Sequence, residues 1–301
     1  MVGRFLAIVL TIGALTFPPS SAGPAYAIAH GTDAPDGAFR FSVLLTMTGL
    51  PTADHGLRDS SCSGALVAPR WVITAGHCFR DAGGRRVSRP VAARTTATIG
   101  RTDLTGRAGH QVEVVAVHQA KNADVALAEI GTAVTDIPPL PVGTEPPAVG
   151  AVLRLTGYGL VDDSDSETTQ RLQTGRFTVV RVDATSVEVA GRSPSAFTSP
   201  CLHDSGGPYF QQRDSGGPVL VAVVSSGPGC PHSGSDVSAR TDNLSDWIAE
   251  TIDGHSAGPL TYGLITAGSL VLVVVLLVGV TTVRRGRRRT PVAAAAVPVS
   301  R

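Results

Sequence analysis

The chain has 301 residues, 43% of them hydrophobic and 16% charged, with a formal net charge of +1 at pH 7. That length allows one or two domains with a sizeable core. The stretch 33–253 holds all 24 acidic residues but 18 of the 25 lysines and arginines, a balance of −6. An acidic globular region argues against nucleic acid as a partner.

Residues 1–27 are predicted to be a secretory signal peptide. Arg4 precedes a short apolar run over 5–17, and Ala25-Tyr26-Ala27 fits the small-x-small pattern that signal peptidase cuts. Pro18-Pro19 breaks the run, which argues against a membrane anchor at this end. Export implies an oxidising compartment, in which the four cysteines are expected to form two disulfides by one of three pairings.

The stretch 28–240 contains many short strand-like segments separated by glycine and proline, which is typical of all-β barrels or sandwiches. Examples are the segments 41–45, 64–69, 111–117, 151–159, 177–182 and 218–227. Five prolines within 138–147 predict a stiff connection between two halves.

A helix is predicted at the end of this region. Its apolar positions recur at helical spacing, and they are Leu244, Trp247, Ile248 and Ile252. Asp242 or Asn243 is available as the N-cap, and Gly254 as the stop. Asn243-Leu244-Ser245 also matches a glycosylation sequon, but its place at a helix start favours capping.

Residues 260–283 contain no charged side chain and are predicted to be one transmembrane helix. These 24 residues, at about 1.5 Å each, reach about 36 Å and exceed a bilayer core of about 30 Å. Arginines follow directly, so the basic tail 284–301 is expected in the cytoplasm. A buried core helix would not have these flanks. A cell-wall sorting signal would need Leu-Pro-x-Thr-Gly where 255–259 stands, which we interpret as a linker.

Three separated segments carry residues with catalytic chemistry. CSGALVAPRWVITAGHC, from Cys62 to Cys78, holds His77; NADVAL holds Asp124; and CLHDSGGP holds Ser205. This order, with the serine inside Asp-Ser-Gly-Gly-Pro, is that of a Ser-His-Asp triad. On these motifs the chain resembles the trypsin/chymotrypsin family of serine peptidases, roughly over 28–252.

The resemblance implies an all-β fold of two six-stranded antiparallel β-barrels with a C-terminal helix, spanning 28–254, and an active site between the barrels. It implies the disulfides Cys62–Cys78 and Cys201–Cys230. It implies no metal and no organic cofactor.

The resemblance also assigns the catalytic roles: Ser205 attacks, His77 takes its proton and Asp124 orients His77. Of the eight histidines only His77 stands in Thr-Ala-x-His-Cys, with Gly76 where the family usually has alanine. Asp103 competes with Asp124, but Asp-Val-Ala-Leu after Ala123 matches the family's segment before a buried strand.

Asp-Ser-Gly-Gly-Pro occurs at 204–208 and again at 214–218, so Ser215 competes with Ser205. Cys201 lies four residues before Ser205, which is the family spacing, whereas Gln211 stands at that offset from Ser215. Only from Ser205 is there room for a hairpin before the substrate-binding Ser-x-Gly. The second copy is therefore interpreted as a turn, which these residue types favour.

The oxyanion hole is expected from the backbone N–H groups of Ser205 and His203, where the family has glycine in place of His203. A side chain at this position disfavours the required loop conformation. This substitution motivates the alternative hypothesis of a catalytically weak or inactive trypsin-fold binding module at the cell surface.

In the family, Asp204 pairs with the amino group of a newly formed N-terminus. Ile28-Ala29-His30-Gly31 resembles that terminus and follows the signal-peptidase site directly, so export alone is expected to expose Ile28. A cut after Ala29 fits the same small-x-small rule, and it would leave the chain inactive.

The substrate-binding residues predicted from the resemblance are Ser199 at the pocket base, Asp236 at a pocket-wall glycine position, and Ser225, Ser226 and Gly227 along the substrate backbone. Asp236 either selects a basic residue at the cleaved bond or is a solvated loop aspartate. The prediction is thus an extracytoplasmic serine endopeptidase acting on proteins or peptides and held by one membrane span. Arginine outnumbers lysine 24 to 1, as in GC-rich bacteria. The oligomeric state is not predicted.

Overall fold

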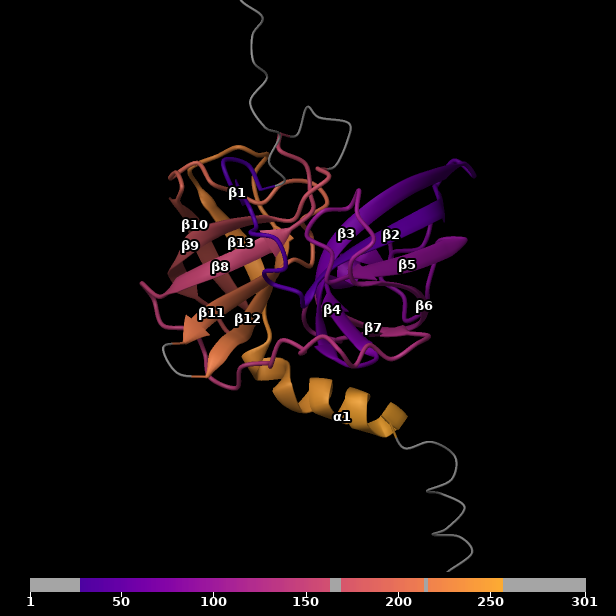
Figure 1. The fold of residues 1–301 in the computed structure, drawn as a ribbon. Helices are drawn as coiled ribbons and strands as arrows, with labels where there is room; N and C mark the ends of the chain where they lie inside the picture. The colour runs from indigo at the N-terminus through magenta and orange to yellow at the C-terminus, as the bar shows by residue number, and fades with distance from the viewer. Residues whose placement is uncertain (1–27, 163–168, 214–215, 257–301) are drawn as a thin grey trace, which may run out of the picture. The chain divides into compact units, whose positions relative to one another are not determined.

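The computed structural model describes residues 28–162, 169–213 and 216–256 (Figure 1). The chain divides into two compact units at residues 243 and 244, and every side chain of the candidate site belongs to the first. In the described part of the chain no helix has the length and hydropathy that a bilayer crossing requires. The predicted signal peptide 1–27, span 260–283 and tail 284–301 lie outside the described residues.

The first half of the first unit is a closed six-stranded barrel, drawn in indigo to purple in Figure 1. Around the barrel the order is β2-β3-β4-β7-β6-β5, and each neighbouring pair is antiparallel. The strands are β2 (Ser42–Pro51), β3 (Leu57–Ala68), β4 (Trp71–Thr74), β5 (Arg94–Ile99), β6 (His110–Gln119) and β7 (Ala126–Ile130).

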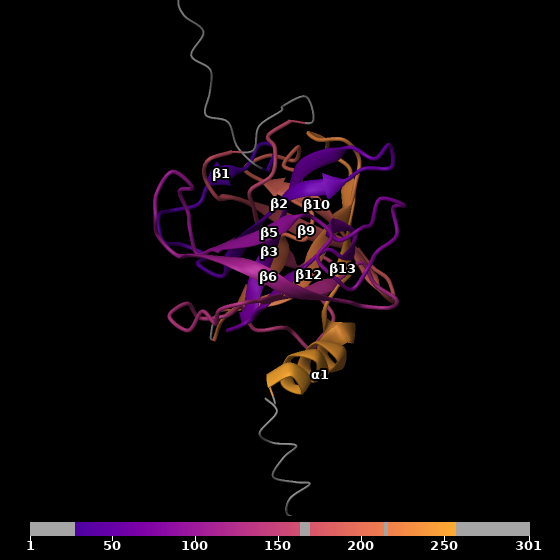
Figure 2. The same ribbon diagram turned by 90° about the vertical axis from the view of Figure 1, so that its right-hand side faces the viewer.

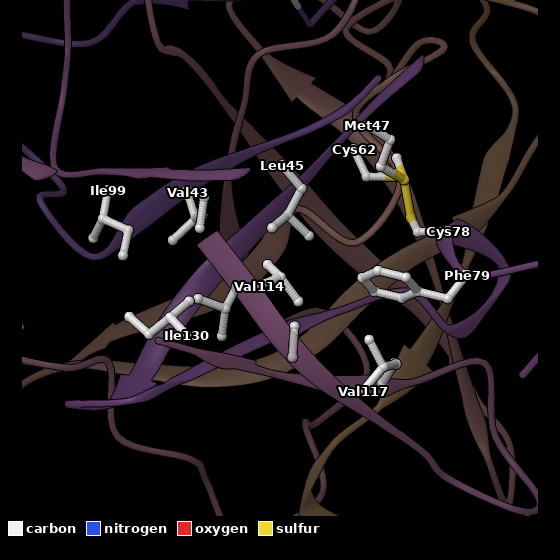
Figure 3. Close-up of a cluster of buried hydrophobic side chains, with 14 of the residues drawn as sticks. Val43, Leu45, Met47, Cys62, Cys78, Phe79, Ile99, Val114, Val117 and Ile130 are labelled. Atoms are coloured by element: carbon white, nitrogen blue, oxygen red, sulfur yellow. A yellow bond between two sulfur atoms is a disulfide. The ribbon is translucent and has the colours of Figure 1, made fainter. Parts of the chain in front are cut away.

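The interior of this barrel is filled by alternating aliphatic side chains (Figure 3). Val43, Leu45 and Ile99 point inward because successive side chains of a strand face opposite sides of the sheet. The Cys62–Cys78 disulfide closes one end of the cluster and lies next to Phe79. This bond ties β3 to the 3-10 turn η1 (Gly76–Cys78), which carries His77.

A second barrel follows, with the order β9-β10-β13-β12-β11-β8 and a closing pair between β8 and β9. Its strands are β8 (Val152–Gly157), β9 (Gln173–Val182), β10 (Ser186–Ser193), β11 (Pro208–Arg213), β12 (Gly217–Ser226) and β13 (Ser235–Arg240). The short β1 (Thr32–Asp33) pairs with β9 and adds the N-terminal segment to this barrel. Figure 2 shows β3, β5 and β6 of the first barrel in front of β9, β12 and β13.

The strand segments predicted from the sequence fall within or overlap β2, β3, β6, β8, β9 and β12, so the all-β prediction is confirmed. The proline-rich 138–147 forms no strand of its own. It lies along β12, where the Leu220 N–H donates to Pro141 and the Leu220 carbonyl accepts from Gly143. This segment links the two barrels as expected.

In the second unit, the described helix α1 runs from Ser245 to Ser256 and is preceded by the 3-10 turn η2 (Asp242–Leu244). The expected helix is confirmed, but the stop at Gly254 is wrong because Gly254 lies inside the last turn. A single glycine costs a helix only about 1 kcal/mol relative to alanine, which is too little to end it by itself.

Candidate active site

His77 and Asp124 are joined by two hydrogen bonds at the edge of the first barrel. The Asp124 carboxylate contacts His77 Nδ1 at 2.6 Å, and it accepts the His77 backbone N–H at 2.9 Å. Ser225 Oγ, from the end of β12, donates to the same carboxylate at 2.7 Å. Burial opposes ionisation of Asp124, but the hydrogen bonds and charge of His77 outweigh it, so the pKa of Asp124 lies below its ordinary value.

Asp103, the competing aspartate, lies elsewhere. Its carboxylate accepts from the Thr105 N–H and hydroxyl and pairs with Arg171 at 3.3 Å. The structure therefore brings Asp124, and not Asp103, to His77.

Behind the His77–Asp124 pair lies Arg86, which the sequence reasoning did not single out. Arg86 Nη1 donates to the Ala123 carbonyl and lies 3.7 Å from an Asp124 carboxylate oxygen. A Cβ at Gly76 would approach Arg86 Nη1 to 2.9 Å and Gln119 Oε1 to 2.5 Å. Glycine at 76 thus leaves the space that Arg86 and Gln119 occupy. In the sequence, the glycine at position 76, where the family usually has alanine, was the feature that could have pointed to Arg86.

Ser205 lies between the Cys201–Cys230 disulfide and β11. Its carbonyl accepts the Ser63 N–H from β3 at 2.9 Å, which ties the serine loop to the first barrel. Gly206 follows with φ 80°, and a Cβ there would lie 2.0 Å from Thr74 Oγ1. This close approach is the physical reason for glycine after the serine.

Ser205 and His77 line one cavity of about 450 Å³, together with Cys78, Leu202 and His203. The hairpin expected after Ser205 is present, because β11 ends at Arg213 and pairs with β12, which begins at Gly217. Ser215 lies outside the described residues.

His203 adopts the left-handed conformation, with φ 74°, which is unfavourable for a residue that carries a side chain. Such a conformation costs roughly 1–2 kcal/mol. Two contacts with β3 hold it, since His203 Nδ1 lies 2.9 Å from the Ser61 carbonyl and Ser63 Oγ donates to the His203 carbonyl at 3.1 Å. The loop therefore keeps its left-handed residue without a glycine.

The backbone N–H of His203 points away from Leu160. The Leu202 carbonyl accepts the Leu160 N–H at 2.8 Å, and a trans peptide directs its C=O and N–H in opposite directions. Within the described residues, neither the His203 N–H nor the Ser205 N–H donates to a protein acceptor. Both donors are available to a ligand.

Asp204 is fully buried and accepts two backbone N–H bonds, from Gly159 at 2.9 Å and from Cys201 at 3.0 Å. Burial outweighs these bonds and raises the pKa of Asp204 to about 8. Ile28 is also fully buried and packs in the core of the second barrel. Ala29 is held beside it, because its carbonyl accepts the Ser199 N–H at 3.2 Å.

A second cavity of about 350 Å³ adjoins Ser205 on the second barrel. It is lined by Pro200, Cys201, Leu202, Ser205, Val224, Ser225, Ser226, Gly227, Pro228, Gly229 and Asp236. Asp236 is 1% exposed and lies in β13, so it is not a solvated loop residue. A Cβ on Gly227 would lie 2.0 Å from the Asp236 carboxylate, so glycine at 227 leaves room for this side chain.

His232, also missed by the sequence reasoning, contacts the Asp236 carboxylate through Nε2 at 3.2 Å. Its backbone N–H donates to Ser199 Oγ at 3.3 Å, and Ser199 is fully buried. Burial, and secondly the charge of Asp204, raise the pKa of Asp236 to about 8. Among the described residues no group of three or more His, Cys, Asp or Glu is arranged to hold a metal ion.

Comparisons with known proteins agree with this geometry. The family described as Trypsin matches residues 28–248. Serine protease 56 of Mus musculus is 30% identical over 263 residues, covering 78% of this chain and 39% of the relative. A Trypsin-like protease of Streptomyces glaucescens is 28% identical over 244 residues, covering 76% of this chain and 83% of the relative.

Transmembrane protease serine 9 of Rattus norvegicus is 29% identical over 218 residues, which cover 65% of this chain and 20% of that protein. The chain thus spans about two fifths of the length of its mouse relative and less of the rat one. The match to the family covers both barrels and the segments that carry His77, Asp124 and Ser205. The chain belongs to the trypsin family of serine proteases.

Proposed function

We propose that the chain is a serine endopeptidase whose nucleophile is Ser205, with His77 as general base and Asp124 as the partner of His77. One observation carries the proposal: the 2.6 Å contact between Asp124 and His77 Nδ1, on a histidine that shares a cavity with Ser205. An imidazole fixed at Nδ1 by a carboxylate presents its other nitrogen as a base.

The reaction follows from these positions. Ser205 Oγ adds to the scissile carbonyl while its proton passes to His77, and the N–H groups of His203 and Ser205 stabilise the oxyanion. His77 then gives the proton to the leaving amine as the C–N bond breaks, which leaves an acyl group on Ser205. Water, deprotonated by His77, releases the acid and restores the serine. The two available N–H donors favour this activity over the inactive binding module.

Substrate binding is proposed along the edge formed by Ser225, Ser226 and Gly227, where an extended peptide adds a strand. The side chain before the scissile bond enters the cavity of Asp236. A cation there pairs with the carboxylate and lowers its pKa from about 8, so we infer a preference for arginine or lysine. Ser199 contributes from its buried position by holding His232.

Activation is proposed to follow from export. A chain cut after Ala27 has an ammonium group on Ile28, beside the second-barrel core in which Ile28 is buried. Pairing with Asp204 supplies the counter-charge that this buried carboxylate needs to ionise.

We further propose that the protein is anchored in a bacterial membrane by a span over 260–283. The protease region then lies outside the cytoplasm and the tail 284–301 lies inside it. The support is the sequence pattern of the cleavable signal, the uncharged run and the arginines after it. Protease added to intact cells should remove the globular part and spare a tag placed after Arg301. Loss of that tag would contradict this orientation.

Labelling with a fluorophosphonate tests the catalytic assignment. The wild-type chain and Ser215→Ala should both take up the label, and Ser205→Ala should take up none. Mass spectrometry of the labelled peptide should identify Ser205. Label on Ser215, or a folded wild-type chain that stays unlabelled, would contradict the proposal.

A further inference from the structure

A third cavity, of about 780 Å³, borders the proposed substrate edge and is not lined by Asp236. It is lined by His77, Arg80, Gly84, Arg86, Asn122, Ala123, Asp124, Ser225 and Ser226. Ser225 and Ser226 border both this cavity and that of Asp236. Successive side chains of an extended peptide point to opposite sides. A substrate with one side chain in the Asp236 cavity therefore directs the preceding side chain into this third cavity.

Two arginines on one hairpin give the cavity its charge. Residues 79–87 form the hairpin, in which the Val87 N–H donates to Phe79 and the Asp81 N–H to Arg85. Arg80 and Arg86 are directly opposite each other across it. Both side chains line the cavity, so the hairpin presents two guanidinium groups next to His77.

The acids nearby are already engaged. Asp124 accepts from His77 and Ser225, and Asp81 pairs with Arg85 at 3.0 Å. Arg86 is held through Nη1, which donates to the Ala123 carbonyl and lies 3.7 Å from Asp124; its Nε and Nη2 groups are left for a ligand. Within the described residues, the Arg80 guanidinium donates to no acceptor side chain, and Arg80 is exposed. The cavity thus has spare donors and a positive charge.

We propose that Arg80 and Arg86 form a subsite for a carboxylate, so that the peptidase prefers aspartate or glutamate at the substrate position just before the one that enters the Asp236 cavity. This subsite rests on the proposed peptidase function. Guanidinium and carboxylate match in geometry and form charge-assisted hydrogen bonds.

The test uses the full chain in its processed form and two pools of peptidyl-aminocoumarins. Both pools carry the same mixture of residues at the position whose bond is cleaved. At the position before it, one pool has aspartate and the other has asparagine. The wild type should hydrolyse the aspartate pool with a kcat/KM about tenfold higher, the range expected for one charge-assisted contact. The ratio should fall as salt is added.

Arg80→Gln and Arg86→Gln should each lower this ratio severalfold. The ratio, and not the absolute rate, reports the subsite, because Arg86 also contacts the segment that carries Asp124. Arg85→Gln is the matched control on the same hairpin, since Arg85 is 84% exposed, pairs with Asp81 and does not line the cavity. It should keep the wild-type ratio.

Equal hydrolysis of both pools by the wild type would overturn the subsite and leave the peptidase assignment standing. An equal fall of the ratio in Arg85→Gln and Arg80→Gln would overturn it too, because a general surface field would then explain the preference. Hydrolysis of neither pool would overturn the proposed function and the subsite with it.

Discussion

Gly76 and Arg86 occupy complementary space next to the His77–Asp124 pair: a Cβ on Gly76 would lie 2.9 Å from Arg86 Nη1. The same guanidinium holds the Ala123 carbonyl, one residue before Asp124. The backbone conformation that positions Asp124 therefore depends on the absence of a side chain at position 76.

The first prediction follows from this relationship. Gly76→Ala displaces Arg86 and Gln119, shifts Asp124 and should lower kcat about tenfold or more, because small errors in catalytic geometry are costly. KM for a peptide substrate should change little. Steady-state kinetics measure both values. The double change Gly76→Ala with Gln119→Ala removes the closest contact of the new Cβ, that with Gln119 Oε1 at 2.5 Å, and keeps Arg86 in place, so it should recover part of kcat; no recovery would contradict this explanation.

The second prediction concerns Asp236. Asp236→Asn removes the carboxyl group that ionises beside a bound cation and should lower kcat/KM for an arginine substrate at least about tenfold, since a buried charge-assisted contact is lost. A matched leucine substrate should be unaffected or cleaved faster. Ser235→Ala, at the neighbouring position where the side chain contacts Glu188, serves as the control. Equal loss for both substrates would mean that Asp236 supports the fold and not the specificity.

The third prediction concerns the conformation of His203. Both His203→Ala and His203→Gly lose the contact of His203 Nδ1 with Ser61. Alanine keeps the free-energy cost of a side chain at φ 74°, whereas glycine removes that cost. His203→Gly should therefore be more stable than His203→Ala by roughly 1–2 kcal/mol. Both should keep peptidase activity, because the proposed oxyanion donor is a backbone group. Urea unfolding and kcat measure these effects, and the reverse order of stability would contradict them.

The fourth prediction uses the pKa of Asp204, which burial raises to about 8 in a chain that continues before Ile28. The folded state then retains a proton that the unfolded state has lost. That contribution to stability is fully present below the ordinary pKa of 3.8 and is lost as the pH rises through about 8. A chain extended by Ala27 should thus lose Tm between about pH 5 and pH 8.

A chain that begins at Ile28 carries its own counter-charge and should show much less of this loss. Thermal unfolding of the two forms at both pH values measures the difference. Asp204→Asn in the extended chain should remove the part of the pH dependence that comes from Asp204, whereas the part from Asp236, whose pKa burial also raises to about 8, remains in every form. An extended chain that is as stable and as active at pH 8 as the processed one would rule out the activation mechanism.

Local patterns predicted the strands, and the family resemblance predicted their arrangement in two barrels. Alternating segments identified strands of both barrels. The match of Asp-Val-Ala-Leu to the family's segment favoured Asp124 over Asp103, and the buried strand β7 follows it. The disulfides followed from the resemblance and are confirmed. Residues 79–87 have no such pattern. Their importance arises from contacts with positions that lie far away in the sequence.

The same limit applies to His232 and Asp236. Their contact depends on how the segment after Cys230 folds back toward β13, which neither periodicity nor composition encodes. Gly76 was noticed as a departure from the family. The reason for it became clear only with Arg86 and Gln119 placed beside it.

The repeated pentapeptide Asp-Ser-Gly-Gly-Pro has a consequence for how this sequence can vary. A Cβ on Gly206 would meet Thr74 Oγ1 at 2.0 Å, whereas one on Gly216, with φ 108°, would meet nothing within 4 Å. Random mutagenesis with selection for peptidase activity should therefore recover almost no substitutions at Gly206, whereas at Gly216 only the backbone strain of φ 108° opposes them. Over generations position 216 is therefore less constrained than position 206, and once it changes a search by motif alone would find a single serine loop.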